Sequence, residues 1–508
     1  MENKFLVVFE ISQKQAYIFD SNKLIDNISN SSIIEYVTSC EYFEKKCGRI
    51  FNKDKNLVYV GGGHSVLEFD DGKSAMEFAK VITLAIREEY RGLEAFIKIN
   101  KYDYNLTPTM NIELLISDLE KKKALRRAYF KQGNFGVEKL NSSTFELELI
   151  NNATQKSRYN LESDYKAYKL ANLFDDLGGT EGVSNFISVV HIDGNSMGKR
   201  VKEFRDNLGV NCTWSEFKTK SREFSEAIDN DYKLAYEEMM DEVIEGIING
   251  KFKELSLKEK NLPVRKIIRA GDDICFVAEG RIGIECARIF IEKLWSKVNP
   301  VDKKNYASCA GVAIVHKKFP FYRAYELSEQ LCNNAKTMIV NLGDKLNISG
   351  NASAIDWHIE YGEMKDSLAD IREMYNTMDG GRLELKPYII CGDDIYTNAE
   401  IYRNYYKFKK MIDSVKNKGE GVARGKLKEM RYVLKQGKIS TKYFIQANKL
   451  DDFAINPINE IFNDITEIQI NSNHIGLSRD LFIKTMDDES RCLIFDALEL
   501  ADNYISMD

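Results

Sequence analysis

The sequence predicts an α+β fold that contains two copies of one β-α-β-β-α-β unit, and three observations carry this prediction. Short apolar runs of strand length alternate with segments whose apolar residues recur at helical spacing. Turns rich in glycine or aspartate separate two pairs of these runs, as in β-hairpins. The same order of elements returns after residue 184 as an internal repeat. This order is that of ferredoxin-like or palm domains.

The first copy is predicted in residues 1–110. Its strand, helix, hairpin, helix and strand are expected at residues 5–11, 32–47, 57–69, 73–90 and 95–99. The hairpin turns at Gly61, Gly62 and Gly63, and glycine allows the positive φ of a tight reversal.

The second copy is predicted in residues 185–380. Its strand, two helices, hairpin, helix, strand and last helix are expected at residues 186–192, 197–207, 214–248, 265–278, 282–298, 308–315 and 321–340. Between the copies, residues 111–184 are expected to form a helical and linker insertion, with a charged helix at 118–131. Residues 381–508 are expected to form a helical C-terminal domain.

Composition narrows the class of protein. With 508 residues, 44% of them hydrophobic and 30% charged, the chain has the balance of a globular protein of several domains. A net charge of −6 does not indicate a protein that is basic overall and binds nucleic acid. The nine cysteines lack the spacing of a zinc site, so we expect reduced thiols in a cytoplasmic protein. We expect neither a signal peptide nor a membrane span.

Three carboxylates are the strongest candidates for chemistry. The first strand of the second copy ends in Asp193, and its hairpin turns at Gly271 with Asp272 and Asp273. In a palm sheet this strand lies antiparallel to the hairpin, so the acids would face one another. Carboxylates of this kind suit Mg²⁺ or Mn²⁺. Two such ions could activate a ribose 3′-hydroxyl and stabilise a leaving pyrophosphate.

Phosphate contacts are expected beside the acids. The turn from Gly194 leads into a helix whose N–H groups can hold a triphosphate, and Lys336 could add a positive charge. The alternative interpretation is that the Asp-Asp pair is turn chemistry and Asp193 a helix cap. A second Gly-Asp-Asp, at residues 392–394, has no following hairpin strand, and we interpret it as a helix-capping turn.

Several motifs resemble one known family. HIDGNSMGKR (residues 191–200) and RAGDDICFV (residues 269–277) resemble the first palm motif and the Gly-Gly-Asp-Asp hairpin of the large subunit of type III CRISPR effector complexes. Residues 310–336 are similar to that family's fourth strand and following helix. Residues 11–19 and 59–69 resemble its degenerate first palm.

The resemblance implies an enzyme that uses two metal ions to polymerise ATP into cyclic oligoadenylate messengers of antiviral defence. Carried over to this sequence, the metal ligands would be Asp193, Asp272 and the Ile192 backbone, with Asp273 a ligand or an organiser of the site. The residues at phosphates would be Asn195, Ser196, Met197, Gly198 and Lys336. The residues lining a partner nucleotide would be Gly61, Gly62, Gly63 and Ser65.

The sequence departs from the family in several places. Ala270 replaces the first hairpin glycine, and it would be strained if that position required positive φ. Asn195 stands where some members carry a further acid. The His-Asp pair of the HD nuclease domain and the usual zinc-binding cysteines are missing. These departures suggest a compact, stand-alone relative, which could work with CRISPR-type effector subunits or as a homo-oligomer.

Residues 398–450 are locally basic, with fourteen Lys and Arg against four acids. Tyrosines interleave with these charges, which suits RNA through phosphate contacts and base stacking. A solvated helical face, or a surface that docks on the acidic remainder of the chain, explains the pattern equally. A non-catalytic RNA-binding scaffold of a ribonucleoprotein complex therefore stays open as the alternative to a cyclic oligonucleotide or cyclic dinucleotide synthase.

Overall fold

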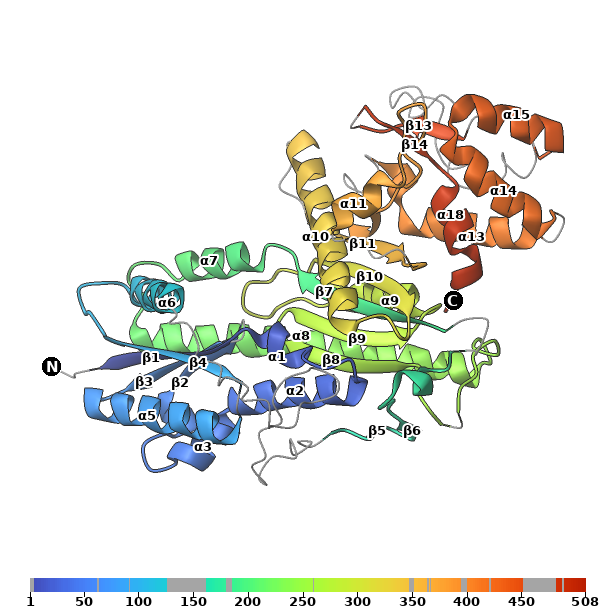
Figure 1. Ribbon diagram of the computed structural model, residues 1–508. Helices are drawn as coiled ribbons and strands as arrows, with labels where there is room; N and C mark the ends of the chain where they lie inside the picture. Colours follow the sequence, from blue (N-terminus) through green and yellow to red (C-terminus); the bar gives the residue numbers. More distant parts are fainter. Residues whose placement is uncertain are drawn as a thin grey trace, which may run out of the picture.

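The structure is a computed structural model of the chain. It describes residues 4–61, 64–90, 92–125, 161–179, 185–258, 260–346, 351–362, 365, 367–393, 400–419, 422–450, 481–486 and 488–508. Two β-sheets lie side by side, and a group of helices near the C-terminus extends beyond the second sheet (Figure 1).

The first sheet has four antiparallel strands in the order β2-β3-β1-β4. These strands are β1 (Phe5–Ser12), β2 (Leu57–Gly61), β3 (His64–Phe69) and β4 (Glu94–Lys101). One face packs on α2 (Leu24–Val37), α3 (Cys40–Cys47) and α5 (Gly72–Glu89), whose aromatic and aliphatic side chains form a buried core with the sheet. The other face packs on α6 (Pro108–Ala124). Short helices α1 (Lys14–Ile18) and α4 (Lys53–Asn56) connect these elements.

The second sheet contains the same four-strand unit. Its strands β7 (Phe186–Gly194), β8 (Val264–Ala270), β9 (Asp273–Glu279) and β10 (Ser308–His316) lie in the order β8-β9-β7-β10. This order matches β2-β3-β1-β4 strand for strand, which confirms the internal repeat and the α+β fold of two palm-type domains. Two further strands extend the sheet: β11 (Ala352–Ile359) runs parallel to β10, and β12 (Tyr388–Gly392) pairs antiparallel with β11.

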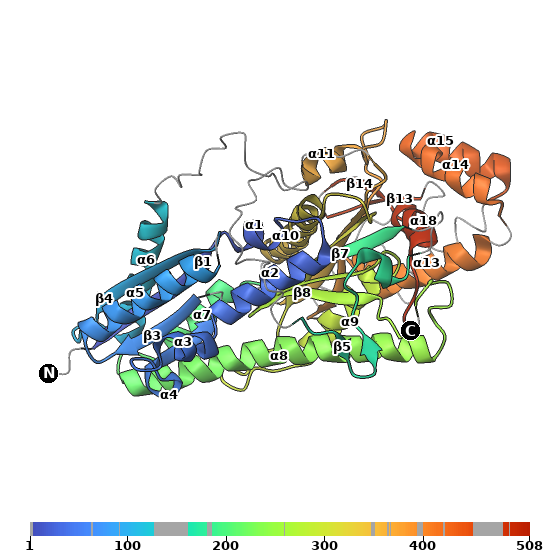
Figure 2. The same cartoon turned by 60° about the horizontal axis from the view of Figure 1, so that its bottom comes forward.

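Helix α8 (Trp214–Ile248) connects the two sheets. It begins at a capping box, in which Thr213 and Glu216 each accept from the other's backbone N–H. Figures 1 and 2 show that it runs along both sheets. Ser225 donates to the carbonyl of Val60 on β2, and Arg269 on β8 contacts Asp229 at 2.7 Å. The hairpins of the two sheets therefore meet α8 about one turn apart.

The remaining helices of the second domain are α7 (Met197–Asn207), α9 (Gly283–Trp295), α10 (Phe321–Leu346) and α11 (Leu368–Glu373). Those nearer the C-terminus are α13 (Tyr405–Gly419), α14 (Arg424–Lys435), α15 (Lys438–Asn448) and α18 (Phe495–Leu500). Two small hairpins are β5 (Asp164–Tyr165) with β6 (Tyr168–Lys169), and β13 (Phe482–Lys484) with β14 (Ser490–Cys492). Single 3₁₀ turns lie at Phe174–Leu177, Ile401–Arg403 and Ala501–Asn503.

Three local expectations differ from the structure. The one helix expected at residues 32–47 is two helices, α2 and α3. The charged helix expected at 118–131 begins ten residues earlier, because Thr107 caps it and Pro108 occupies its first position. The second sheet includes β12, which lies beyond the expected end of the second palm domain at residue 380. The domain boundaries themselves stay predictions. None of the helices in the described ranges combines the length and the apolar character that crossing a membrane requires.

Candidate active site

Asp193 and Asp273 are direct partners across the antiparallel pair β7–β9. Asp193 is the eighth residue of β7, and Asp273 is the first residue of β9. Gly271 turns the β8–β9 hairpin with a φ of 66°, a value that favours glycine. The expected meeting of the β7 end with the hairpin tip is therefore present.

The three acids divide between two faces of the sheet. Side chains alternate along a strand, so the ladder partners Asp193 and Asp273 project on one face and Gly194 lies on the other. Asp272 belongs to the turn before β9, and its contact with Gly194 places its carboxylate on that second face. On its face, Asp272 lies close to the backbone of Gly194, where a Cβ atom would stand 3.1 Å from the Asp272 Oδ2 atom. The same Cβ would stand 2.8 Å from the hydroxyl of Tyr232. Glycine at 194 thus lets a carboxylate and a phenol approach the strand end.

Lys336 of α10 reaches the strand end that carries Asp193. Its Nζ atom donates to Asp193 Oδ2 at 2.6 Å and to the carbonyl of Gly194 at 2.9 Å. Burial by itself would lower the pKa of Lys336, but the neighbouring Asp193 carboxylate outweighs it and the pKa is raised. The ammonium therefore stays charged beside the acids, where it can pair with a carboxylate or with phosphate.

Both hairpin acids hold their protons unusually tightly. Burial, followed by repulsion from Asp193, raises the pKa of Asp272 to about 6 and that of Asp273 to about 7. About a third of the Asp273 side chain, 34%, remains exposed, so a solute can reach it. Carboxylates that repel one another in this way are stabilised by a cation placed between them.

Unsatisfied polar atoms surround the acids. His191 Nδ1 and Asp273 Oδ1 lie 3.4 Å apart, and neither atom has a hydrogen-bond partner among the described residues. The hydroxyl of Tyr232 is fully buried and is likewise unpartnered within the described ranges. Burial lowers the pKa of His191, which favours the neutral imidazole. Buried polar atoms without partners are uncommon in folded proteins and mark places where water, an ion or a ligand binds.

The donor set fits a hard divalent cation. The carboxylates of Asp193 and Asp273 share a face, their charges repel, and one Asp273 oxygen is unpartnered. In the described part of the chain, no three His, Cys, Asp or Glu side chains already converge as metal ligands. Instead, Lys336 pairs with Asp193. A cation bound here would therefore compete with that ammonium.

Three residues of the site lie outside the sequence predictions. Two are His191, which precedes Asp193 by two positions on the same strand face, and Tyr232 of α8. The third is Glu329 of α10, whose charge acts on both Asp273 and His191. His191 could have been found from strand alternation in the HIDG segment. Tyr232 and Glu329 depend on how helices pack on the sheet, which the sequence pattern does not reveal.

Ala270 does not carry the expected backbone strain. It is the last residue of β8 and pairs with Asp273 in the ladder, and its φ is not positive. The positive φ of the turn belongs to Gly271 alone within this hairpin. Replacing the family's first hairpin glycine by alanine is therefore compatible with the turn.

The start of α7 offers backbone donors. Ser196 precedes the helix with a φ of 54° and makes no side-chain capping bond, so it leaves the first-turn N–H groups of Met197 and Gly198 uncapped. Asn195 differs from expectation, since its backbone N–H donates to Ala307 at 2.8 Å and its amide donates to Ala352 at 2.7 Å. Asn195 thus orients the turn.

The first hairpin is only partly described. Gly61 ends β2 and pairs with His64, whereas Gly62 and Gly63 lie outside the described residues. Ser65 is fully buried, and its hydroxyl donates to the carbonyl of Thr38 at 3.3 Å. Ser65 therefore connects β3 to the end of α2.

A cavity of about 640 Å³ opens between α7, α8 and the loop before β10. Arg200 lines it and donates to both carboxylate oxygens of Asp302, at 2.7 and 2.9 Å. The guanidinium of Arg200 also stacks on Tyr306, 4.5 Å from the ring centre. This volume is that of a small-molecule site, and the cavity shares α7 with the backbone donors described above.

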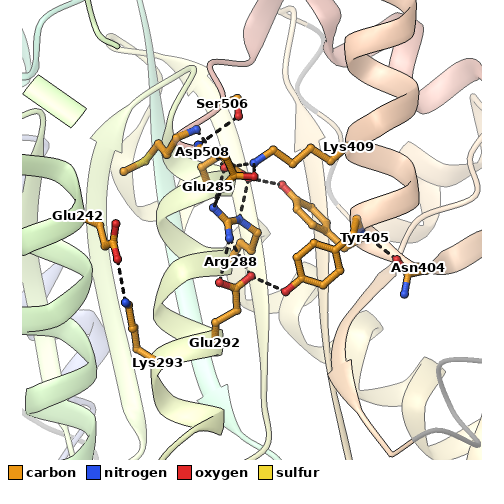
Figure 3. A network of polar contacts seen from close by, with 12 residues as sticks. Glu242, Glu285, Arg288, Glu292, Lys293, Asn404, Tyr405, Lys409, Ser506 and Asp508 are labelled. Atoms are coloured by element: carbon orange, nitrogen blue, oxygen red, sulfur yellow. Dashed lines mark hydrogen bonds and ion pairs between the residues drawn. The ribbon is translucent and has the colours of Figure 1, made fainter. Parts of the chain in front are cut away.

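Part of the basic segment is used for docking. Lys409 of α13 is buried and contacts Glu285 of α9 at 2.8 Å, and Tyr405 donates to the same carboxylate at 2.9 Å (Figure 3). Tyr402 is buried as well. For these buried residues, the interpretation that applies is a surface that docks on acidic parts of the same chain. The exposed members on α13 are Tyr406, Lys410 and Lys416. Those on α14 and α15 and at their ends are Arg424, Lys428, Tyr432, Lys435, Lys442, Tyr443 and Lys449.

The second Gly-Asp-Asp differs from the first. Gly392 ends the edge strand β12, and the Asp393 carboxylate accepts from the backbone N–H of Asn351 at 3.1 Å. Asp394 and the residues up to 399 lie outside the described ranges, so the expected helix-capping turn is not tested. Asp393 ties β12 to the start of β11.

The fold and the acidic strand edge define a protein of two palm-type domains with its candidate site on the second. Residues 186–341 match the family model of Cas10/Cmr2, second palm domain. The resemblance to the large-subunit family of type III CRISPR effector complexes is thereby confirmed: the chain is Cas10-like in these residues, which are similar to the second palm domain of that family. No curated protein matches the chain in sequence.

Solved structures share the fold over nearly the whole chain. The Csm1–Csm4 cassette in complex with cA3 has 12% identity and a TM-score of 0.53. The same cassette in complex with cA4 has 13% identity and a TM-score of 0.52. The Csm1–Csm4 subcomplex of the type III-A CRISPR-Csm interference complex has 13% identity and a TM-score of 0.51. Each match covers 99% of this chain and 70% of the other.

Proposed function

We propose that this protein is a metal-dependent nucleotidyltransferase that joins ATP molecules into cyclic oligoadenylates, or into a cyclic dinucleotide, for antiviral signalling. One observation carries the proposal: Asp193 and Asp273 face each other at the end of β7 beside the charged Lys336. The similar Csm1–Csm4 structures were solved with ATP, AMPPNP, pppApA, cA3 and cA4, which supports a nucleotide substrate for this fold.

The residues have separate roles in this proposal. Two Mg²⁺ or Mn²⁺ ions, held by Asp193, Asp272, Asp273 and the Ile192 carbonyl, would activate the attacking 3′-hydroxyl and neutralise the leaving pyrophosphate. The uncapped N–H groups of α7 would bind phosphate oxygens, with Asn195, Ser196, Met197 and Gly198 shaping that turn. Lys336 would exchange its pairing with Asp193 for a phosphate contact.

The binding site for the second nucleotide would be formed by the first domain. Gly61, Gly62, Gly63 and Ser65 belong to its hairpin, and this hairpin meets α8 one turn from the contact of Arg269. The cavity lined by Arg200 is large enough to enclose a nucleoside and lies along the middle and end of α7. We propose that partners of the effector-subunit type, or a second copy of the chain, complete the assembly.

The test is direct. Incubating the purified chain with ATP and Mn²⁺ should give a product whose mass is a multiple of the adenylate unit, and Asp272→Ala with Asp273→Ala should abolish it. Product formation that survives this double change would refute the assignment of the site.

A second function is favoured by one observation. Basic residues and the tyrosines Tyr432 and Tyr443, which are 68% and 69% exposed, share the surface of α14 and α15. This composition suits single-stranded RNA, which binds through phosphate contacts and base stacking. A protein that makes no nucleotide product but binds RNA through α14 and α15 would be a scaffold.

A further inference from the structure

A second, smaller cavity lies on the other side of α10 from the acids. It has a volume of about 160 Å³ and is lined by residues of α10, α11, the segment before β12, and β14. Figure 1 shows where these elements lie in the fold. At 3.6 residues per turn, the α10 residues that line it, among them Asn334, Asn341 and Lys345, lie on the helix face opposite Lys336. The cavity is therefore separate from the proposed nucleotide site.

Positive charge dominates the lining. The six cationic residues are Lys345, Arg372, Arg382, Lys386, Arg403 and Arg491, against the two carboxylates of Glu384 and Glu400. An apolar or neutral core would not gather six cations around one void, because each buried charge carries a desolvation cost.

Acids outside the lining hold several of these cations in place. Arg372 donates to both carboxylate oxygens of Asp356, at 2.6 and 2.7 Å. Lys386 contacts Glu499 at 2.8 Å, and Arg491 contacts Glu489 at 2.6 Å. None of these three acids is among the described residues that line the cavity. These three acids thus hold three of the six cations from outside the lining. Within the lining, Arg403 pairs with Glu400 at 2.6 Å and Arg382 lies 3.5 Å from Glu384.

Two guanidinium groups of the lining keep N–H donors that could bind an anion. Arg372 is 8% exposed and Arg491 is 9% exposed, so both are more than nine-tenths buried. Arg372 Nη1 and Arg491 Nε are buried, and neither has a hydrogen-bond partner in the described part of the chain. An unsatisfied guanidinium donor is costly unless an acceptor binds to it, and a phosphate oxygen is a geometrically matched acceptor.

The volume limits what fits. A cavity of about 160 Å³ corresponds to roughly five water molecules at liquid density, and it falls below the roughly 300 Å³ of typical nucleotide-sized pockets. We propose that this cavity binds a small phosphate-type oxyanion, such as inorganic phosphate or pyrophosphate, between α10, α11 and β14. This inference does not rest on the proposed function, because the cavity shares none of its lining residues with the acidic site.

The test uses the full chain in a buffer without divalent cations. Phosphate is titrated against chloride at constant ionic strength, with the melting temperature and ³¹P NMR line width as readouts. Lys345→Gln with Arg382→Gln removes two lining charges that lie toward solvent, since Lys345 is exposed and the Arg382 side chain is 30% exposed. The matched control is Lys73→Gln with Lys80→Gln, two exposed lysines of α5 that lie outside the cavity.

We expect saturable phosphate binding that weakens about tenfold or more in the cavity variant and stays unchanged in the control. Equal binding in wild type and cavity variant would overturn the proposal, as would loss of binding in Lys336→Gln, which would place the phosphate in the acidic site. Pyrophosphate and ATP form separate arms: a cavity-dependent response to phosphate or pyrophosphate identifies a free anion, and one to ATP alone identifies the terminal phosphate of a nucleotide.

Discussion

Asp193 and Asp273 stand opposite each other in the β7–β9 ladder, and Lys336 binds only the first of them in the described contacts. One carboxylate is thus paired with a cation, and its neighbour keeps an unpartnered oxygen and a pKa raised to about 7 by burial and by Asp193. This asymmetry leaves room for a cation on the Asp273 side, and the following predictions depend on it.

Asp273→Asn should abolish the formation of product from ATP, because the amide removes the charge that faces Asp193. Asp393→Asn is the matched control, since Asp393 lies in the other Gly-Asp-Asp and binds the backbone of Asn351. We expect the control to keep wild-type product yield, measured by mass spectrometry of ATP reactions. Equal loss in both variants would mean that Asp273 has no special role.

The same substitution should stabilise the protein when divalent ions are absent. The pKa of Asp273 is raised in the folded state from an ordinary 3.8 to about 7, so folding favours its protonated form. The stability linked to that proton is fully present below pH 3.8 and is lost as the pH rises through 7. Asp273→Asn imitates the protonated form and should therefore melt a few degrees higher than wild type at pH 8.

The gain in melting temperature should shrink as the pH falls from 7 toward 4, and excess Mn²⁺ should raise the melting temperature of wild type but not of the variant. Thermal scans in EDTA and in Mn²⁺ measure both effects. A variant that melts at or below the wild-type temperature at pH 8 in EDTA would show that the ionised Asp273 carboxylate does not destabilise the folded protein.

Lys336→Met should lower activity and change its pH dependence. The charge of Lys336 lowers the pKa of both Asp272 and Asp273, so its removal should raise those values further. The acidic limb of the pH–rate profile should then move to higher pH, while Lys336→Arg should keep the limb near its wild-type position. If the limb stays fixed in Lys336→Met while the rate falls, the lysine acts only on substrate.

The sequence alone was sufficient to predict the helices and strands whose ends are set by local patterns. Residues 214–248 were expected as one helix and form α8 with the same bounds, because Thr213 and Glu216 make a capping box. The hairpin acids and the strand ending near Asp193 were found in the same way. Strands β11 and β12 were not predicted, since their pairing with β10 joins segments that are distant in the sequence.

Side-chain environments were harder to predict. Tyr402, Tyr405 and Lys409 fit a basic and aromatic RNA surface by composition, yet all three are buried, and the last two bind Glu285. Which face of α13 turns inward depends on the acids of α9, and a single-sequence pattern does not encode that contact. Likewise, the sequence does not show which residue of the hairpin turn adopts the positive φ, so backbone strain was expected at Ala270. In the structure Gly271 has the positive φ.

Gly194→Ala and Gly198→Ala should have opposite effects. A Cβ at 194 would stand 2.5 Å from Met197 Cγ and 2.8 Å from the Tyr232 hydroxyl, so overpacking should cost about 1–3 kcal/mol and displace Asp272. A Cβ at 198 would meet nothing within 4 Å on exposed α7, so alanine should add up to about 1 kcal/mol through helix propensity. Urea unfolding measures both, and a Gly194→Ala protein as stable as wild type would contradict the close approach.

The last prediction concerns the binding of single-stranded RNA by the exposed surface of α14 and α15. Arg424, Lys428 and Lys435 are exposed, so changing all three to Gln should weaken binding of single-stranded RNA and reduce the slope of log affinity against log salt by about two. Lys409→Gln serves as the contrast, because its ammonium is buried against Glu285 and its loss should lower the melting temperature rather than the salt slope. RNA affinity that ignores salt, or that survives the triple change in fluorescence anisotropy titrations, would exclude phosphate contacts by these helices and with them the scaffold function.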